Sequence, residues 1–168
     1  MLLNRAVTSS RNSGTPQFWK IFHACLNAVI CNNDFGGVQA SRSTLEQRIP
    51  QKIRLLQSLR AAGVWLVDAS IAALYVPRQP KPHPHLHETA IEHSWDLYTG
   101  DVVAEAQPQA IICIGHGVER ILRSRIDRLG IPWLRVPQPN ARLSSKEHFA
   151  AFATYRSICE DPRRVNRL

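Results

Sequence analysis

Residues 108–136 read PQAIICIGHGVERILRSRIDRLGIPWLRV, and this stretch decides the fold. Its segment 111–115 is a short, continuous apolar run, which is typical of a buried β-strand. The apolar residues that follow recur at helical spacing and form one face, made of Val118, Ile121, Leu122, Ile126 and Leu129. Gly130 predicts the end of this helix, and a second strand follows at 133–136. A strand, a helix and a strand in this order predict two parallel strands joined by a crossover helix.

The N-terminal part of the chain adds two helices and a third strand. We expect one helix from Pro16 through residue 29, because proline is favoured at the first helical position. Pro50 is expected to open a second helix, whose inward face carries Ile53, Leu56 and Leu59. The continuous apolar run 64–68 predicts a further buried strand.

Three segments complete the pattern. The Pro-rich, basic stretch 76–87 predicts an exposed loop. A helix is expected at 88–106, loosened near Gly100. Ser144 and Glu147 have the spacing of a capping box, which predicts the start of a final helix.

These elements predict an α/β fold, a three-layer α/β/α sandwich around a short and mainly parallel sheet. We expect a single domain over residues 16–160. Residues 1–15 are polar and lack periodicity, so they are interpreted as a loose leader, and residues 161–168 as a basic tail.

The overall charge favours a polyanionic partner. The 168 residues contain 21 Lys and Arg against 13 Asp and Glu, which gives a formal charge of +8. DNA or RNA is therefore a candidate partner, although many small basic proteins bind neither. No stretch approaches the roughly 18 apolar residues of a membrane span. We expect a cytoplasmic monomer with no membrane partner.

The cysteines and histidines do not predict a metal site or a cofactor. The four cysteines form no C-x-x-C pair, and Cys113 within an apolar run is interpreted as a small buried thiol. We expect no disulfide. Four histidines cluster in and after the Pro-rich stretch, where a solvated loop is favoured over zinc binding, namely His83, His85, His87 and His93.

The fold class points to where a ligand would bind. In parallel α/β sheets, ligands bind beyond the carboxyl ends of the strands. Three segments follow predicted strands and are candidates for one crevice: residues 68–70, 115–117 and 137–144. At 115–117, the sequence Gly-His-Gly is interpreted either as a turn that holds phosphate on helix N–H groups or as a tight packing turn.

Four segments, in order, resemble motifs of the uracil-DNA glycosylase superfamily. Residues 16–21 (PQFWKI) are similar to the Phe-Trp helix of the mismatch-specific enzymes. Residues 63–69 (GVWLVDA) resemble the strand that ends in a base-recognising Asn, and residues 107–115 (QPQAIICIG) resemble a later strand. Residues 138–142 (QPNAR) occupy the place of the second catalytic motif. The resemblance covers residues 16–160.

The resemblance implies a DNA-binding protein that acts on a base flipped out of the duplex. It assigns base recognition to Asp68, whose carboxylate accepts but does not donate, so it suits a ring N–H or an exocyclic amine and not O4 of uracil. Gln138 and Asn140 take the catalytic positions that support the leaving group. Arg142 takes the place of the residue that fills the gap in the duplex, with His116 and Ser144 as further DNA contacts. For each of these residues except Gln138, a purely local role in a loop, turn or cap is the alternative.

One motif of the family is missing from its expected place. The first catalytic motif, with its water-orienting Asp or Asn, should precede the Phe-Trp helix, and counting back from Phe18 runs off the start of the chain. The resemblance therefore leaves three hypotheses open. The chain hydrolyses N-glycosidic bonds in base excision, binds DNA without catalysis, or is a truncated gene product.

Overall fold

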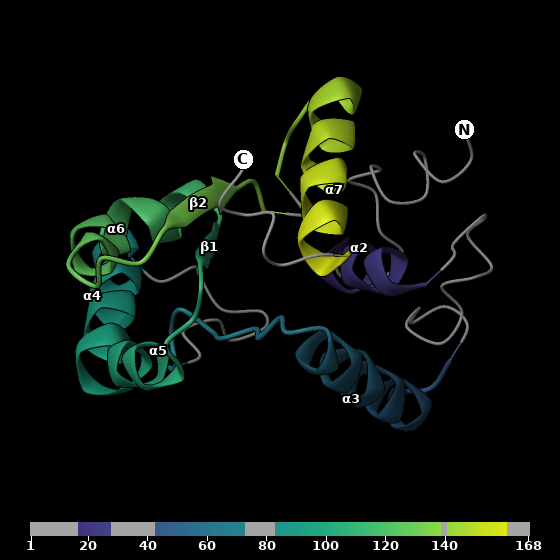
Figure 1. The fold of residues 1–168 in the computed structure, drawn as a ribbon, viewed down its shortest axis with the longest axis horizontal. Coiled ribbons are helices and arrows are strands. Elements are labelled where there is room, and N and C mark those ends of the chain that lie inside the picture. Colours follow the sequence, from purple (N-terminus) through teal and green to yellow (C-terminus); the bar gives the residue numbers. More distant parts are fainter. Residues whose placement is uncertain (1–16, 28–42, 73–82, 139–140, 161–168) are drawn as a thin grey trace. The chain divides into compact units, whose positions relative to one another are not determined.

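The computed structural model of the chain describes residues 17–27, 43–72, 83–138 and 141–160. In chain order, the helices and strands are α2 (Gln17–Leu26), α3 (Leu45–Ala61), α4 (Pro84–Ser94), the π-helix η2 (Trp95–Thr99), α5 (Gly100–Ala106), β1 (Ile111–Ile114), α6 (His116–Asp127), β2 (Trp133–Val136) and α7 (Ser145–Glu160) (Figure 1). β1 and β2 pair in parallel, so the predicted α/β class with a short parallel sheet is confirmed. The expected leader 1–15 and tail 161–168 lie outside the described residues.

The chain divides into two compact units. Unit 1 comprises residues 1–65 and 136–168, and unit 2 comprises residues 66–135. Unit 1 contains α2, α3 and α7, whereas unit 2 contains the helices from α4 to α6 together with β1 and nearly all of β2. Among the helices in the described ranges, none is long and apolar enough to cross a membrane.

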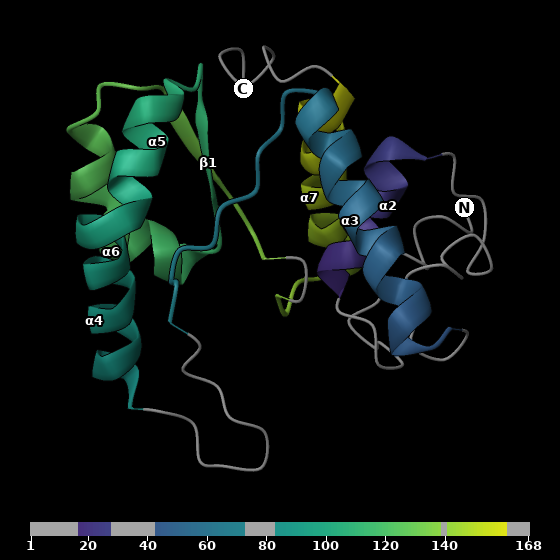
Figure 2. The ribbon, with the colours of Figure 1, turned by 90° about the horizontal axis from the view of Figure 1, so that it is seen from below.

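Unit 2 is built on the predicted strand–helix–strand stretch. The Ile111 N–H donates to the Pro132 carbonyl at 2.9 Å, where the two strands begin to pair. The helices α4, α5 and α6 gather on one side of the strand pair (Figure 2). As the periodicity predicts, α6 turns an apolar face inward, and the buried core of the unit consists of Ile91, Cys113, Leu122 and Ile126. Half-buried Trp95 and Trp133 pack against this core.

The helix expected at 88–106 begins earlier and changes its pitch on the way. It starts at Pro84, so the end of the predicted Pro-rich loop is helical, because Pro84 supplies a favourable first helical residue and His83 caps it. The Gly100 N–H donates to the Trp95 carbonyl, which is the wider hydrogen bond of a π-turn. A Cβ on Gly100 would stand 2.8 Å from the Trp95 carbonyl oxygen. The predicted loosening at Gly100 is therefore a π-helix that needs this glycine.

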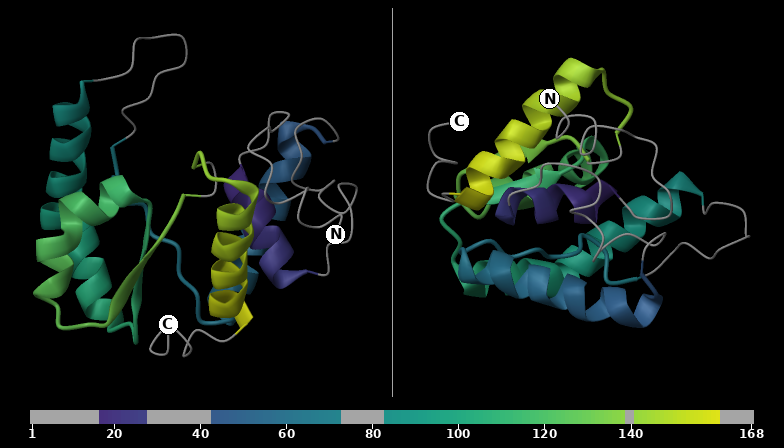
Figure 3. Two further views of the ribbon diagram at one scale, coloured as in Figure 1. Left: turned by 90° about the horizontal axis from the view of Figure 1, so that it is seen from above. Right: turned by 90° about the vertical axis from the view of Figure 1, so that its right-hand side faces the viewer.

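Unit 1 is held together by α2, which contacts both α3 and α7 (Figure 3). α2 forms close to where the sequence predicts it, and it buries Ile21, Phe22 and Cys25. The ring of Phe22 meets the ring of Tyr155 on α7 edge-on, with centroids 5.5 Å apart. Aromatic pairs in this arrangement contribute about 0.5–1.5 kcal/mol beyond the area that they bury.

Helix α3 differs from the prediction in both its start and its buried face. It begins at Leu45, ahead of Pro50, because Thr44 and Gln47 form a capping box at its N-terminus. Leu59 is fully buried as expected, but Ile53 and Leu56 are 49% and 39% exposed. Leu55 is buried instead, since the helix packs through a face rotated from the predicted one.

The prediction of a β-strand at residues 64–68 is wrong. α3 ends in a turn in which the Val64 N–H donates to the Leu59 carbonyl at 2.8 Å, and Gly63 has a φ of +81°. The following residues are irregular, and Trp65 and Val67 are 58% and 45% exposed. An apolar run becomes a strand only when a neighbour satisfies its backbone groups, and here the run carries the chain from unit 1 into unit 2.

Candidate functional site

The carboxyl ends of β1 and β2 in unit 2 bring polar side chains together. β1 ends at Ile114, and Gly115 turns the chain with a φ of +102°, a conformation that favours glycine. His116 follows as the first residue of α6, and Arg135 lies near the end of β2. This edge is where parallel α/β sheets place their ligands.

His116 shares one ring nitrogen between two partners. Its Nδ1 lies 3.0 Å from the Arg135 guanidinium and 3.0 Å from a Glu119 carboxylate oxygen. A ring nitrogen either donates or accepts, so Nδ1 bonds Glu119 when protonated and accepts from Arg135 when not. The His116 side chain is 70% exposed and Arg135 is exposed as well, whereas Glu119 is buried. Arg135 therefore presents positive charge to solvent, and both exposed side chains present N–H donors, above a buried carboxylate.

Glu119 is fixed by a second basic residue. The Arg123 guanidinium donates two hydrogen bonds to its other carboxylate oxygen, one of them 2.8 Å long from Nε. These bonds, and then the charges of Arg123 and His116, hold the pKa of the Glu119 carboxyl below its usual value. Arg123 also stacks on Trp133, 5.2 Å from the ring centroid. Glu119 is thus an ionised anchor that orients His116.

The remaining arginines of α6 bind carboxylates on neighbouring helices. Arg120 bonds Glu88 on α4. Arg125 reaches Asp96 on η2 with both Nε and Nη2 at 2.9 Å, and Glu92 on α4 at 3.3 Å. The hydrogen bond to Arg125 lowers the pKa of Asp96. A basic helix face that could follow phosphates is therefore largely compensated within unit 2.

The sequence-predicted residues are divided between the two units. His116 and Asp68 belong to unit 2, whereas Gln138, Arg142 and Ser144 belong to unit 1. Asp68 is exposed and does not follow a strand, so the strand end that would present it to a base is missing. Asn140 lies outside the described residues.

Gln138 and Arg142 are exposed on the segment between β2 and α7. The Tyr155 hydroxyl donates to the Pro137 carbonyl at 2.8 Å, which anchors the backbone directly before Gln138. Arg142 is free to extend from the surface as its predicted DNA contact requires, and both roles stay predictions.

Ser144 has a local structural role. Its hydroxyl accepts the Glu147 N–H at 3.3 Å and donates to the Glu147 carboxylate at 2.6 Å. That carboxylate also accepts the Ser144 N–H at 2.8 Å, which completes the predicted capping box of α7. The hydroxyl proton that a phosphate would accept is therefore already engaged.

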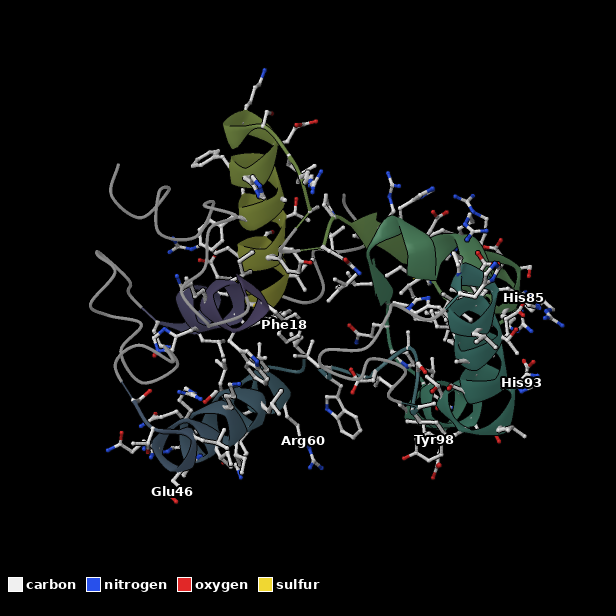
Figure 4. The ribbon with its side chains drawn as sticks, turned by 180° about the vertical axis from the view of Figure 1, so that it is seen from behind. Phe18, Glu46, Arg60, His85, His93 and Tyr98 are labelled. Carbon is white, nitrogen blue, oxygen red and sulfur yellow. The ribbon has the colours of Figure 1, made fainter. Side chains whose placement is uncertain are left out.

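The clustered histidines show no arrangement for a metal. Figure 4 shows His85 and His93 on α4 with side chains directed outward, and both are exposed. His83 accepts the His85 N–H through Nδ1 at 3.2 Å, so it caps the helix. Within the described ranges, no three His, Cys, Asp or Glu side chains gather closely enough to hold a metal ion.

Sequence reasoning missed Arg135 and Glu119 as neighbours of His116. The Glu119–Arg123 pair has i,i+4 spacing and the His116–Glu119 pair has i,i+3 spacing, which are local signals of contact on a helix. Arg135 gave no local signal, because its contact with His116 depends on the pairing of β1 with β2.

Comparison of the chain with models of protein families, with curated proteins and with solved structures finds no match.

Proposed function

We propose that this chain is a uracil-DNA glycosylase-like DNA-binding protein, and that His116 and Arg135 contact the phosphate backbone. The observation that carries the proposal is their geometry: two exposed basic side chains 3.0 Å apart at the carboxyl ends of parallel strands. A phosphate offers the acceptor oxygens that these N–H groups bind. The formal charge of +8 supports a polyanionic partner.

The position of the proton on His116 decides whether Arg135 can turn toward a phosphate. When Nδ1 carries a proton, it donates to Glu119, and the guanidinium of Arg135 is then released toward the phosphate. Glu119 thus acts as a positioning residue for His116, while Arg135 and His116 make the contact.

The test is the affinity of the full chain for duplex DNA, measured by fluorescence anisotropy over a series of salt concentrations. Arg135→Ala should weaken binding by about tenfold, because a charge-assisted hydrogen bond contributes at least about 1.5 kcal/mol. It should also reduce the slope of log affinity against log salt by about 0.9, the value for one phosphate contact. Arg156→Ala is the matched control, since Glu160 already pairs with that arginine on α7.

Two results would overturn the proposal. One is a folded chain that does not bind duplex DNA even at low salt. The other is an equal loss of affinity in Arg135→Ala and Arg156→Ala, which would mean that only total charge matters.

Base excision is the second candidate, and the anchored backbone before Gln138 favours it. The Gln138 amide can donate to a departing base, in the position that the resemblance gives to a catalytic residue, and Tyr155 holds the backbone directly before it. Release of uracil, hypoxanthine or a mismatched base from oligonucleotides tests it. Base release that Gln138→Ala abolishes supports catalysis. A folded, DNA-binding chain that releases none of these bases leaves the non-catalytic function.

A further inference from the structure

Helices α2 and α7 of unit 1 place two cysteines against each other. Cys25 lies near the end of α2, and Cys159 is the second-last residue of α7. Their side chains hydrogen-bond each other, and both residues are buried, with 8% and 5% exposure. Both are free thiols. The edge-on contact of Phe22 with Tyr155 fixes the packing of the same two helices.

The two sulfurs have different acidities. The hydrogen bond between them raises the pKa of Cys25 far above its usual value and lowers the pKa of Cys159. Burial adds to the rise at Cys25. Cys159 is therefore the sulfur that carries negative charge more readily, and a thiolate is the form that attacks an oxidant.

Cys113 provides an internal contrast. It is buried in the core of unit 2, where desolvation raises the pKa of its thiol to about 11. It packs against apolar side chains of the core, the carboxylate of Glu119 raises its pKa further, and burial without a thiol neighbour is the usual state of an inert structural cysteine.

We propose that Cys25 and Cys159 are a modification site, a dithiol that a hydroperoxide oxidises to a reversible disulfide joining α2 to α7. The Cys159 thiolate attacks one oxygen of hydrogen peroxide, the O–O bond breaks, and hydroxide leaves and takes up a proton to become water. The sulfur of Cys159 is now a sulfenic acid. The Cys25 sulfur attacks it, the S–O bond breaks, and the thiol proton leaves with the hydroxyl group as a second water molecule. Two thiols and one peroxide thus give one disulfide and two waters.

The burial of the pair decides which oxidant fits. Hydrogen peroxide is close to water in size, whereas a glutathione disulfide must bring a peptide-sized group against the attacked sulfur. Because both thiols are almost fully covered, the small oxidant is favoured. A sulfenic acid formed in this place meets its resolving thiol at once, which protects it from further oxidation.

The test is oxidation of the full, folded chain with hydrogen peroxide, followed by non-reducing peptide mapping and intact-mass measurement. The expected product is a cross-linked pair of peptides that contain Cys25 and Cys159, with a mass loss of two hydrogens that dithiothreitol reverses. Cys31→Ser and Cys113→Ser should keep the cross-link. Cys25→Ala and Cys159→Ala should lose it, and Cys25→Ala should accumulate sulfenic acid on Cys159, detected by dimedone labelling.

Oxidation and peptide mapping of the wild-type chain test the proposal even if one of the cysteine variants does not fold. Oxidation of Cys159 to sulfinic acid without a cross-link would overturn the proposal. So would a cross-link in which Cys31 or Cys113 replaces either partner.

Discussion

In unit 2, the arginines of α6 reach carboxylates on α4 and η2, whereas in unit 1 the contact between α2 and α7 is made by aromatic rings and two thiols. Both units contain helices that are rich in basic residues, and in the described part of unit 2 acidic side chains on other elements pair with Arg120 and Arg125. Arg125, for example, is only 19% exposed and binds two carboxylates. A row of arginines on a helix is therefore weak evidence for phosphate binding until the carboxylates of neighbouring helices have been located.

The largest effect is expected from truncating the core of unit 2. Ile126 is 1% exposed, so Ile126→Ala should lower the free energy of unfolding by about 2–5 kcal/mol. Ile121→Ala on the same helix is the control, because that side chain is only half-buried and should cost less. Urea unfolding of both variants checks this. Equal losses would show that the apolar face of α6 is not oriented as described.

The second-largest loss of stability is expected from a change beside the π-helix η2, which contains Asp96, a partner of Arg125. In Gly100→Ala, the new Cβ would stand 2.8 Å from the Trp95 carbonyl oxygen and 2.9 Å from the indole nitrogen. We expect a loss of about 1–3 kcal/mol in the stability of the chain, as for other overpacked sites. Gly117→Ala on α6 is the control, since open space surrounds that position. Thermal unfolding that ranks the two variants in the opposite order would contradict the described turn.

A smaller effect tests the role of Ser144 in unit 1. Ser144→Ala removes the N-cap of α7 and should cost about 1 kcal/mol of stability, whereas Ser144→Asp should retain it. If capping is its role, the alanine variant, once folded, binds duplex DNA with unchanged affinity. A reduced affinity of folded Ser144→Ala would instead support its predicted DNA contact.

The smallest effect is a change in the response of unit 2 to acid. The pKa of Glu119 is held below its usual value in the folded chain, so its ion pair with Arg123 stabilises the fold at neutral pH. That stabilisation is lost as the pH falls through the folded pKa, because the carboxyl then takes up a proton. Glu119→Gln should therefore flatten the fall of the thermal midpoint as the pH drops below the usual range of a carboxyl. An unchanged slope would show that the pair contributes nothing measurable.

Local patterns predicted much of the fold. The strand 133–136 and the capping box at Ser144 and Glu147 form as expected, because each depends on residues close together in the chain. The run 64–68 failed for the opposite reason, since a strand needs a partner that its own sequence does not specify. Pro50 misled the prediction of α3, although Thr44 and Gln47 carry the spacing of the capping box that starts it.

The candidate sites were less accessible to sequence reasoning. His116 was identified from its place after a strand, but its contact with Arg135 arises only when β1 and β2 pair. Cys25 and Cys159 are far apart in the chain, and no spacing rule connects them before α2 packs on α7. Contacts of this kind are set by tertiary packing, which a single sequence does not reveal.

The most direct test of the contrast between paired and available arginines is their modification by a dicarbonyl reagent, mapped by mass spectrometry with and without duplex DNA. We expect Arg135 to react in the free chain and to be protected by DNA. Arg123 and Arg125, held by carboxylates, should react slowly in both conditions. Protection of Arg123 and Arg125 by DNA, with Arg135 unaffected, would contradict the account and assign the phosphate contacts to these two arginines instead.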